Sequence, residues 1–132
     1  MATLRARVSD ARQLVLELRR LSVDHPFEGL IVVGYGADGH PCGMAANPRH
    51  RALSWMKVWE LVGLADELAA HSVTLLVFPV GPAPAPSTHE IAVFRDLQAR
   101  ARRAGLPLLD CHVWRGERMW SLRELHEERV SA

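Results

Sequence analysis

Cysteine is scarce in this sequence, and its scarcity excludes two common kinds of site. The 132 residues contain two cysteines, Cys42 and Cys111, and these are too far apart to form a CxxC pair. A disulfide framework or a zinc site built from thiolates needs more cysteines at closer spacing. We therefore expect two reduced thiols, as is usual in a cytoplasmic protein.

A strong charge of one sign and long apolar runs are also missing. The formal net charge is +1, which gives no general reason to expect nucleic acid or an anionic membrane as a partner. No apolar run approaches the roughly 20 residues that are needed to span a bilayer. Met1 to Arg20 carries charges throughout and has no apolar core of a signal peptide. We therefore expect a cytoplasmic protein without membrane contact.

The composition that remains is that of an ordinary globular protein. Hydrophobic residues make up 48% of the chain and charged residues 23%. This length and balance suit one domain with its own hydrophobic core. Since no repeat or linker divides the sequence, we expect 1–132 to form a single domain.

The most informative stretch runs from Thr74 to Glu90. Thr74 to Phe78 is aliphatic and β-branched, which predicts a buried strand. The proline-rich connection around Gly81 permits neither a helix nor an inner strand. Ser87, three residues before Glu90, forms the capping-box pattern that marks a helix start. A strand end held beside a helix start is a common place for chemistry in α/β proteins, yet this loop carries few reactive side chains.

Periodicity and turn signals predict the other elements. Helices are expected over 9–20, 52–70, 87–104 and 124–130. Strands are expected over 30–33, 41–46, 74–78, 108–114 and 119–122. Turns at 37–40 and 115–118 predict two antiparallel hairpins, and the helix between the strands near 75 and 110 permits a parallel pair. The expected fold class is α/β of the mixed (α+β) kind, with a mixed sheet flanked by helices in the order α-β-β-α-β-α-β-β.

The helix expected over 52–70 is apolar around most of its circumference. Ser54, Lys57 and Glu60 leave only a narrow polar strip. Burial of this helix between the sheet and its neighbours is the simpler interpretation. The alternative is that part of it, especially Trp55 or Trp59, forms a homodimer face.

Arginines cluster in the C-terminal half of the helix expected over 87–104, at Arg95, Arg100, Arg102 and Arg103. Cations near a helix C-terminus interact favourably with the helix dipole, so a solvated face is the simpler interpretation. A phosphate-binding patch is the alternative. This cluster, with Trp114, is the only feature that would support binding to DNA.

Three motifs follow one another in the second half of the chain. They are Pro86-Ser87-Thr88-His89-Glu90, Gly105-Leu106-Pro107-Leu108-Leu109-Asp110-Cys111 and Ser121-Leu122-Arg123-Glu124. With Glu for Asp and Cys for the final His, they resemble P-S-x-x-D, G-I-x-x-L-D-H and S-L-x-E of the RadC-like branch of the JAB/MPN domains. That is the fold of the JAMM zinc metalloproteases. The resemblance extends over nearly the whole chain and implies a curved mixed sheet between helices.

The resemblance also implies where the family's zinc site would lie. In active relatives, two histidines at a strand end and an acidic residue of the next helix hold zinc, and an early Glu is the general base. The two histidine positions fall here on Phe78 and Val80, which cannot bind zinc. Glu28 remains at the base position, with Ser87 and Glu90 at the helix start, and one carboxylate does not hold zinc by itself. The resemblance therefore implies a remnant site with no catalytic residue, no metal and no cofactor.

Three functional hypotheses follow from these observations. The first is a non-catalytic JAB/MPN-type domain for protein interaction or scaffolding, whose partner is another protein or a second copy of the chain. The second is a metal-dependent isopeptidase or peptidase with a rebuilt site, for which His89, Glu90 and Cys111 are the candidates. The third is a RadC-like module associated with DNA repair.

Overall fold

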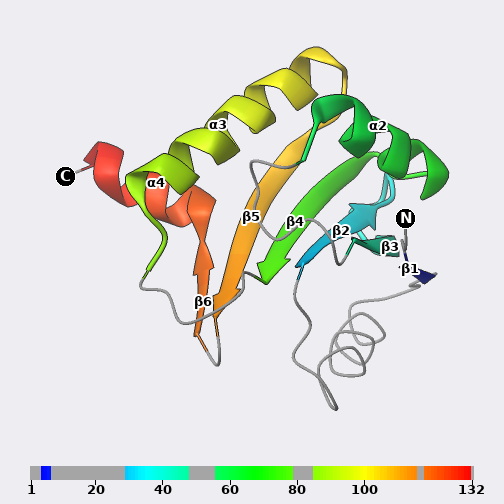
Figure 1. Cartoon of the computed structure of the whole chain (residues 1–132). Helices are drawn as coiled ribbons and strands as arrows, with labels where there is room; N and C mark the ends of the chain where they lie inside the picture. Colours follow the sequence, from blue (N-terminus) through cyan, green and yellow to red (C-terminus); the bar gives the residue numbers. More distant parts are fainter. Residues whose placement is uncertain (1–3, 7–28, 48–55, 79–84, 116–117, 132) are drawn as a thin grey trace.

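The computed structural model describes residues 4–6, 29–47, 56–78, 85–115 and 118–131 (Figure 1). The strands are β1 (Leu4–Ala6), β2 (Gly29–Tyr35), β3 (Pro41–Asn47), β4 (Ser72–Phe78), β5 (Leu108–Arg115) and β6 (Arg118–Ser121). The described helices are α2 (Val58–Glu67), α3 (Thr88–Arg103) and α4 (Leu122–Ser131). The helix expected over 9–20 lies outside the described residues.

The strands form one mixed sheet in the order β1-β3-β2-β4-β5-β6. β4 and β5 pair in parallel, and every other neighbouring pair is antiparallel. Both predicted hairpins and the predicted parallel pair are therefore confirmed, as is the mixed α+β fold class. The parallel pair forms because α3 carries the chain from the end of β4 back to the start of β5.

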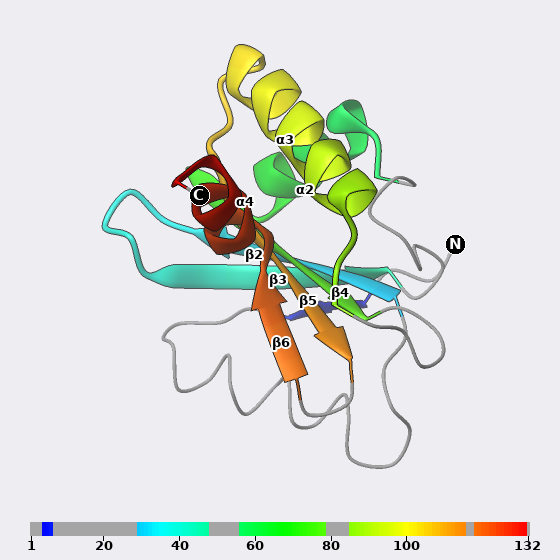
Figure 2. The same ribbon diagram turned by 90° about the vertical axis from the view of Figure 1, so that its left-hand side faces the viewer.

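The described helices all lie on one face of the sheet, as two perpendicular views show (Figures 1 and 2). Side chains alternate along β4, so Val73, Leu75 and Val77 enter the core under the helices while Leu76 and Phe78 belong to a second apolar cluster. We call the two sides the helix-covered face and the opposite face. The opposite face is also apolar and buried, with Ile31, Val33, Met44, Ala46 and Leu76 at most 6% exposed.

Several boundaries and one strand differ from the sequence-based expectation. α2 begins at Val58 and not at 52, because Lys57 has extended backbone angles of φ −94° and ψ 145°. The strand expected over 119–122 ends at Ser121, because Leu122 already starts α4. β1 was not predicted, since three residues are too few for a periodic signal, and it forms by pairing Leu4–Ala6 with the edge of β3.

α2 and α3 end in the same hydrogen-bonded turn but with different residues. In each, the residue two positions after the C-cap donates its N–H to a carbonyl five residues back: Ala70 to Ala65 and Leu106 to Ala101, both at 2.9 Å. This Schellman motif places the intervening residue in the left-handed region. That residue is Gly105 (φ 83°) after α3 but Ala69 (φ 53°) after α2.

We therefore expect Ala69→Gly to raise the free energy of unfolding by about 1 kcal/mol, because glycine adopts positive φ without strain. The matched reverse change, Gly105→Ala, is expected to lower it by about 1 kcal/mol. Steric overlap does not complicate the second variant, since no atom lies within 4 Å of an added Cβ. Urea unfolding measures both, and equal signs for the two changes would contradict the prediction.

Candidate functional site

Phe78 and Val80 fall at the positions of the zinc-binding histidines in the RadC-like pattern, and of the two only Phe78 lies within the described residues. It lies at the end of β4, half-buried, with its side chain on the opposite face. Its ring stacks on that of Trp114 in β5, with centroids 5.7 Å apart and planes 17° apart. The register explains the contact, because Val77 pairs with Val113 and the next residues in both strands are neighbours on the same face. Val80 and Glu28 lie outside the described residues.

Ser87 and Glu90 lie at the start of α3, as predicted. The Ser87 Oγ accepts a hydrogen bond from the Glu90 backbone N–H at 3.2 Å, which confirms Ser87 as the N-cap. α3 packs through Ile91 and Phe94 on the helix-covered face. Phe78 projects from the opposite face, so the structure does not bring Phe78 and Glu90 together.

The alternative metal set combines three side chains with very different exposure. His89 is exposed, Glu90 is half-buried and Cys111 is fully buried. Neither this set nor any other group of three or more His, Cys, Asp or Glu residues within the described ranges has the arrangement of a metal site. Cys111 lies in the core on the helix-covered face.

Burial raises the pKa of the Cys111 thiol well above its usual range, and the carboxylates of Asp110 and Glu90 raise this pKa further. Because the thiolate is the reactive form, Cys111 is the least suited of the two thiols to act as a nucleophile. Cys42 is half-buried and donates its S–H to the Leu68 carbonyl at 3.5 Å.

We expect iodoacetamide to label Cys42 and not Cys111 in the folded protein at about pH 8. Cys111 should react only after unfolding in denaturant, and a Cys42→Ser variant should remain unlabelled in the folded state. Mass spectrometry of tryptic peptides makes the measurement. Labelling of Cys111 as fast as Cys42 in the folded protein would contradict this prediction.

The densest polar cluster in the described part of the chain surrounds Asp110, whose side chain is only 8% exposed. Its Oδ1 accepts hydrogen bonds from the backbone N–H of Cys111 at 2.7 Å and of Arg123 at 3.1 Å. Its Oδ2 accepts from the Ser121 hydroxyl at 2.6 Å. The same Ser121 oxygen accepts from the Glu124 N–H at 3.1 Å, so Ser121 and Asp110 together cap α4.

The side chains of Arg123 and His112 complete the surroundings of this carboxylate. The Arg123 Nε and the His112 Nε2 each lie 3.6 Å from the Asp110 Oδ2. The other ring nitrogen of His112, Nδ1, is buried without a hydrogen-bond partner. A carboxylate at a helix N-terminus is favoured by the helix dipole. Because Ser121 donates its proton to a carboxylate and not to a histidine, this cluster has the geometry of a helix cap and not of a nucleophile with its base.

The sequence motifs contain both residues of this cluster but do not predict their contact. Asp110 and Ser121 belong to separate parts of the RadC-like pattern. The hairpin of β5 and β6 brings them together, because His112 pairs with Ser121 and Asp110 lies two residues before His112. The sequence signal for this cap is Ser121-Leu122-Arg123-Glu124, a capping box that marks Leu122 as the first helical residue.

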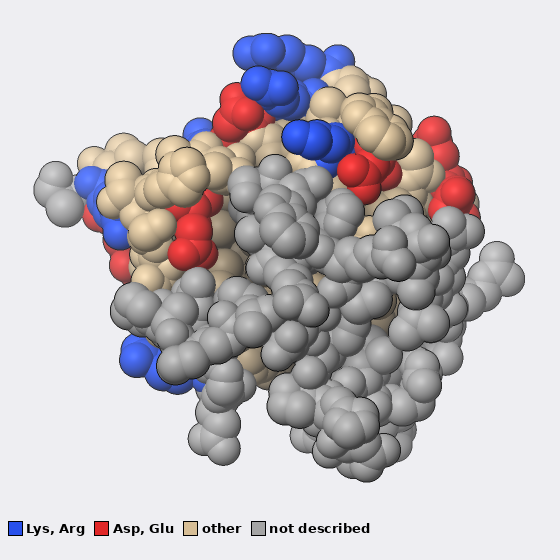
Figure 3. Space-filling view, viewed as in Figure 1, with Lys and Arg blue, Asp and Glu red and all other residues tan. Residues whose placement is uncertain are grey.

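The arginine cluster on α3 lies within a surface of mixed charge. Arg100 pairs with Asp96 at 3.0 Å, and Arg95 donates to the Gln98 side chain at 2.6 Å. Figure 3 shows basic and acidic side chains next to each other over the helix layer. This arrangement agrees with the simpler interpretation of a solvated helix face.

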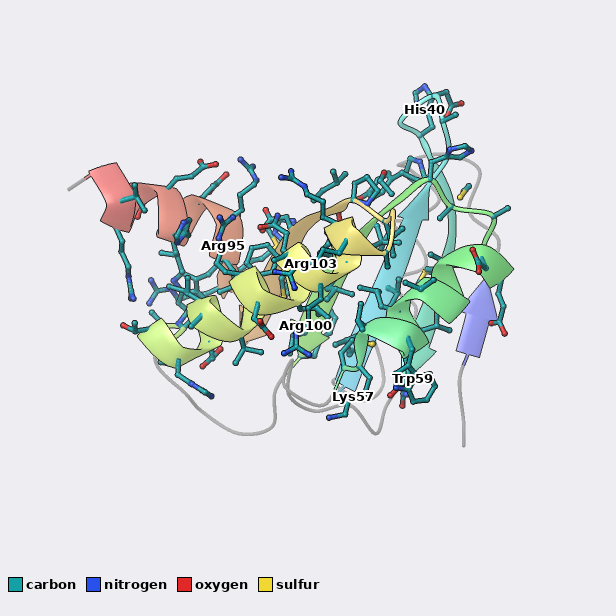
Figure 4. All side chains as sticks on the ribbon, turned by 90° about the horizontal axis from the view of Figure 1, so that it is seen from above. His40, Lys57, Trp59, Arg95, Arg100 and Arg103 are labelled. Carbon is teal, nitrogen blue, oxygen red and sulfur yellow. The ribbon has the colours of Figure 1, made fainter. Side chains whose placement is uncertain are left out.

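Trp59 is 72% exposed on α2, whereas Trp55 lies outside the described residues. Seen from the helix side, Trp59 and Lys57 project at one margin of the layer, away from α4 (Figure 4). The apolar face of α2 is nevertheless used in the core, through Leu61 and Ala65. One face of α2 is thus buried in the core, as the simpler interpretation predicted, and a dimer contact through Trp59 stays a prediction.

No protein-family model matches this chain, and none of the curated proteins matches it significantly. The similarity to RadC-like JAB/MPN domains therefore stays a prediction that depends on the motifs alone. None of the helices in the described ranges is long and apolar enough to cross a membrane.

Proposed function

We propose that this chain is a non-catalytic protein-interaction domain of JAB/MPN type, in which the positions that hold zinc in active relatives have structural roles. The stack of Phe78 on Trp114, at 5.7 Å between ring centroids, carries this proposal. A phenyl ring offers no lone pair to a metal. Stacked aromatic pairs contribute about 1 kcal/mol beyond their buried area, so the side chain at this position stabilises the sheet.

The polar residues of the other motifs support the same proposal. The Ser87 hydroxyl caps α3, and Asp110 with Ser121 caps α4. Cys111, at the position of the family's final His, is part of the core. Each motif that carries the resemblance thus holds a helix end or fills the interior, and none leaves its polar atoms converging on an open site.

The metal content of the purified protein tests the non-catalytic part of this proposal. After exposure to excess zinc and dialysis, we expect less than about 0.1 equivalent of bound zinc, because tight binding needs three or four protein ligands. Elemental analysis of the parent chain and of a Glu90→Gln variant should give the same low value. Near-stoichiometric zinc in the parent that is lost in Glu90→Gln would overturn the proposal. Peptide hydrolysis by the zinc-loaded chain would then be measured.

The interaction part of the proposal is supported by large apolar side chains that remain exposed. Four such side chains occur among the described residues: Trp59 at 72%, Leu109 at 46%, Met119 at 51% and Val130 at 71% exposure. Of these residue types, tryptophan and methionine are enriched at protein interfaces. Of the four, Met119 has the most informative surroundings, because it lies on the last strand of the sheet.

A further inference from the structure

β6 is the outermost strand at one end of the sheet, beside β5. Within the described part of the chain, β5 is its only strand partner. The outer N–H and C=O groups of such a strand form a template for pairing with another strand. Figure 2 views the molecule from this side, with β6 at the near edge of the sheet. β6 contains no proline, lysine or bulge, and its only devices against edge pairing are its short length of four residues and the charge of Arg118.

An apolar strip on the opposite face of the sheet leads to this edge. Phe78 of β4 stacks on Trp114 of β5, and Trp114 pairs in register with Met119 of β6. Exposure increases along the strip: Phe78 and Trp114 are half-buried, and Met119 is 51% exposed. The strip therefore ends in the exposed Met119 on β6, and the outer edge of β6 has no strand partner among the described residues.

We propose that β6 pairs antiparallel with β6 of a second copy of this chain, which joins two sheets into one. This inference rests on the proposed interaction function and names its partner. In such a dimer the two-fold axis is perpendicular to the sheet, and each face of one sheet continues into the same face of the other. Residues that lie opposite each other across the two β6 strands therefore point to the same face. Met119 then meets Met119 of the partner subunit on the opposite face.

In the same register, the two copies are also complementary on the helix-covered face. With Met119 on the two-fold axis, Arg118 lies opposite Trp120 of the partner subunit. Within one chain the Arg118 guanidinium already lies over the Trp120 ring, 4.7 Å from its centroid. The pair can form across the interface in the same way, and a cation over a tryptophan face is a favourable contact. A second copy places another tryptophan ring next to each Arg118, whereas an unrelated strand leaves Arg118 with the ring of its own chain, so a second copy is the favoured occupant.

The short length of β6 limits the expected affinity. A stable interface of standard size buries about 1,600 Å² in total, and a four-residue strand pair covers only part of this area. α4 begins where β6 ends and adds contact area beside the joined strands. We therefore expect a dimer that dissociates on dilution.

Cysteine cross-linking tests the register directly. In antiparallel strands, residues that face each other have Cα atoms about 4.5 to 5.5 Å apart, which suits a disulfide. In a Cys42→Ser background, Met119→Cys should form a covalent dimer with oxidised glutathione. Trp59→Cys in the same background is the matched control, because residue 59 is even more exposed. We expect Met119→Cys to cross-link more than about tenfold faster, because pairing raises the effective concentration of the two thiols.

Sedimentation equilibrium on the parent chain and two charge variants gives the second measurement. The parent should approach twice its 14.7 kDa chain mass as the concentration rises. Met119→Glu should remain monomeric, because it places two like charges opposite each other. Trp59→Glu should still dimerise, and circular dichroism checks that both variants fold.

Both measurements can support or overturn the proposed β6 dimer. A parent chain that is monomeric up to its solubility limit would overturn it, as would equal cross-linking of the two cysteine variants. A dimer lost in Trp59→Glu but kept in Met119→Glu would place the interface on α2 and would also overturn it. Zinc binding decides the proposed function separately, so a monomeric, zinc-free chain would reject the β6 dimer and leave the non-catalytic assignment in place.

Discussion

Replacing Asp110 by alanine is expected to lower the free energy of unfolding by about 3 kcal/mol. The change removes a carboxylate that accepts hydrogen bonds from Ser121, Cys111 and Arg123. It leaves two backbone N–H groups and a hydroxyl without their acceptor, in a place where the carboxylate is only 8% exposed. The Arg123 Nε and the ring of His112 also lose the anion 3.6 Å away. Urea unfolding followed by circular dichroism makes the measurement.

Asp96→Ala is the matched control for the Asp110 variant. It removes an aspartate that pairs with Arg100 at 3.0 Å but is 65% exposed, and we expect a loss of less than about 0.5 kcal/mol. A double-mutant cycle with Ser121→Ala should show strong coupling to Asp110→Ala, since the two side chains share one cap. A loss of less than about 1 kcal/mol for Asp110→Ala would mean that water replaces the carboxylate as the acceptor.

Phe94→Ala is expected to lower the free energy of unfolding by about 4 kcal/mol, which is more than the loss expected for Asp110→Ala. Phe94 is 0% exposed and lies in the core between α3 and the sheet. Removing the ring forfeits its burial and leaves a cavity that neighbouring rigid strands cannot fill. Thermal and urea unfolding would measure the loss.

A milder variant keeps the Phe94 prediction testable if the alanine variant does not fold. Phe94→Leu retains most of the apolar volume and should cost about 1 to 1.5 kcal/mol. Val130→Ala, at a position that is 71% exposed near the end of α4, should change the free energy of unfolding by less than about 0.5 kcal/mol. Similar losses for Phe94→Ala and Val130→Ala would show that α3 is not part of the cooperative core.

Phe94 and Asp110 stabilise neighbouring parts of the molecule. Phe94 holds α3 against the sheet, and Asp110 with Ser121 fixes where α4 leaves β6. α3 and α4 also touch directly, as the Arg129 side chain donates to the Thr88 hydroxyl at 2.6 Å. Since α4 continues from the strand that we propose as the dimer edge, loss of the Asp110 cap should weaken dimerisation together with stability.

The strands and hairpins were the most predictable features of the fold. The apolar run from Thr74 to Phe78 forms β4, and the Asp38-Gly39 turn joins β2 to β3. Each signal is local: an apolar run favours burial, and Gly39 adopts the positive φ of 83° that the turn requires. Ser87 capped α3 as predicted because a cap depends on residues within one turn of the helix.

The candidate site was less predictable, because its positions were matched along the chain and not in space. Phe78 and Glu90 are both near the loop between β4 and α3 in sequence. The alternation of side chains along β4 nevertheless sends Phe78 to the face opposite α3. The partner of Phe78 is Trp114, which is 36 residues further along the chain and becomes its neighbour only through the parallel pairing of β4 and β5.

Local signals were enough to predict the mixed sheet, the order of most elements and the start of α3, since these depend on periodicity, turn residues and caps over a few positions. The start of α2, the pairing of β1 with β3 and the capping of α4 by Asp110 became evident only from the folded chain. The tertiary structure also decided which apolar side chains remain exposed, Met119 at the sheet edge among them. The physical reason is that burial and strand pairing depend on contacts between residues that are distant in sequence, whose combined free energy no local pattern records.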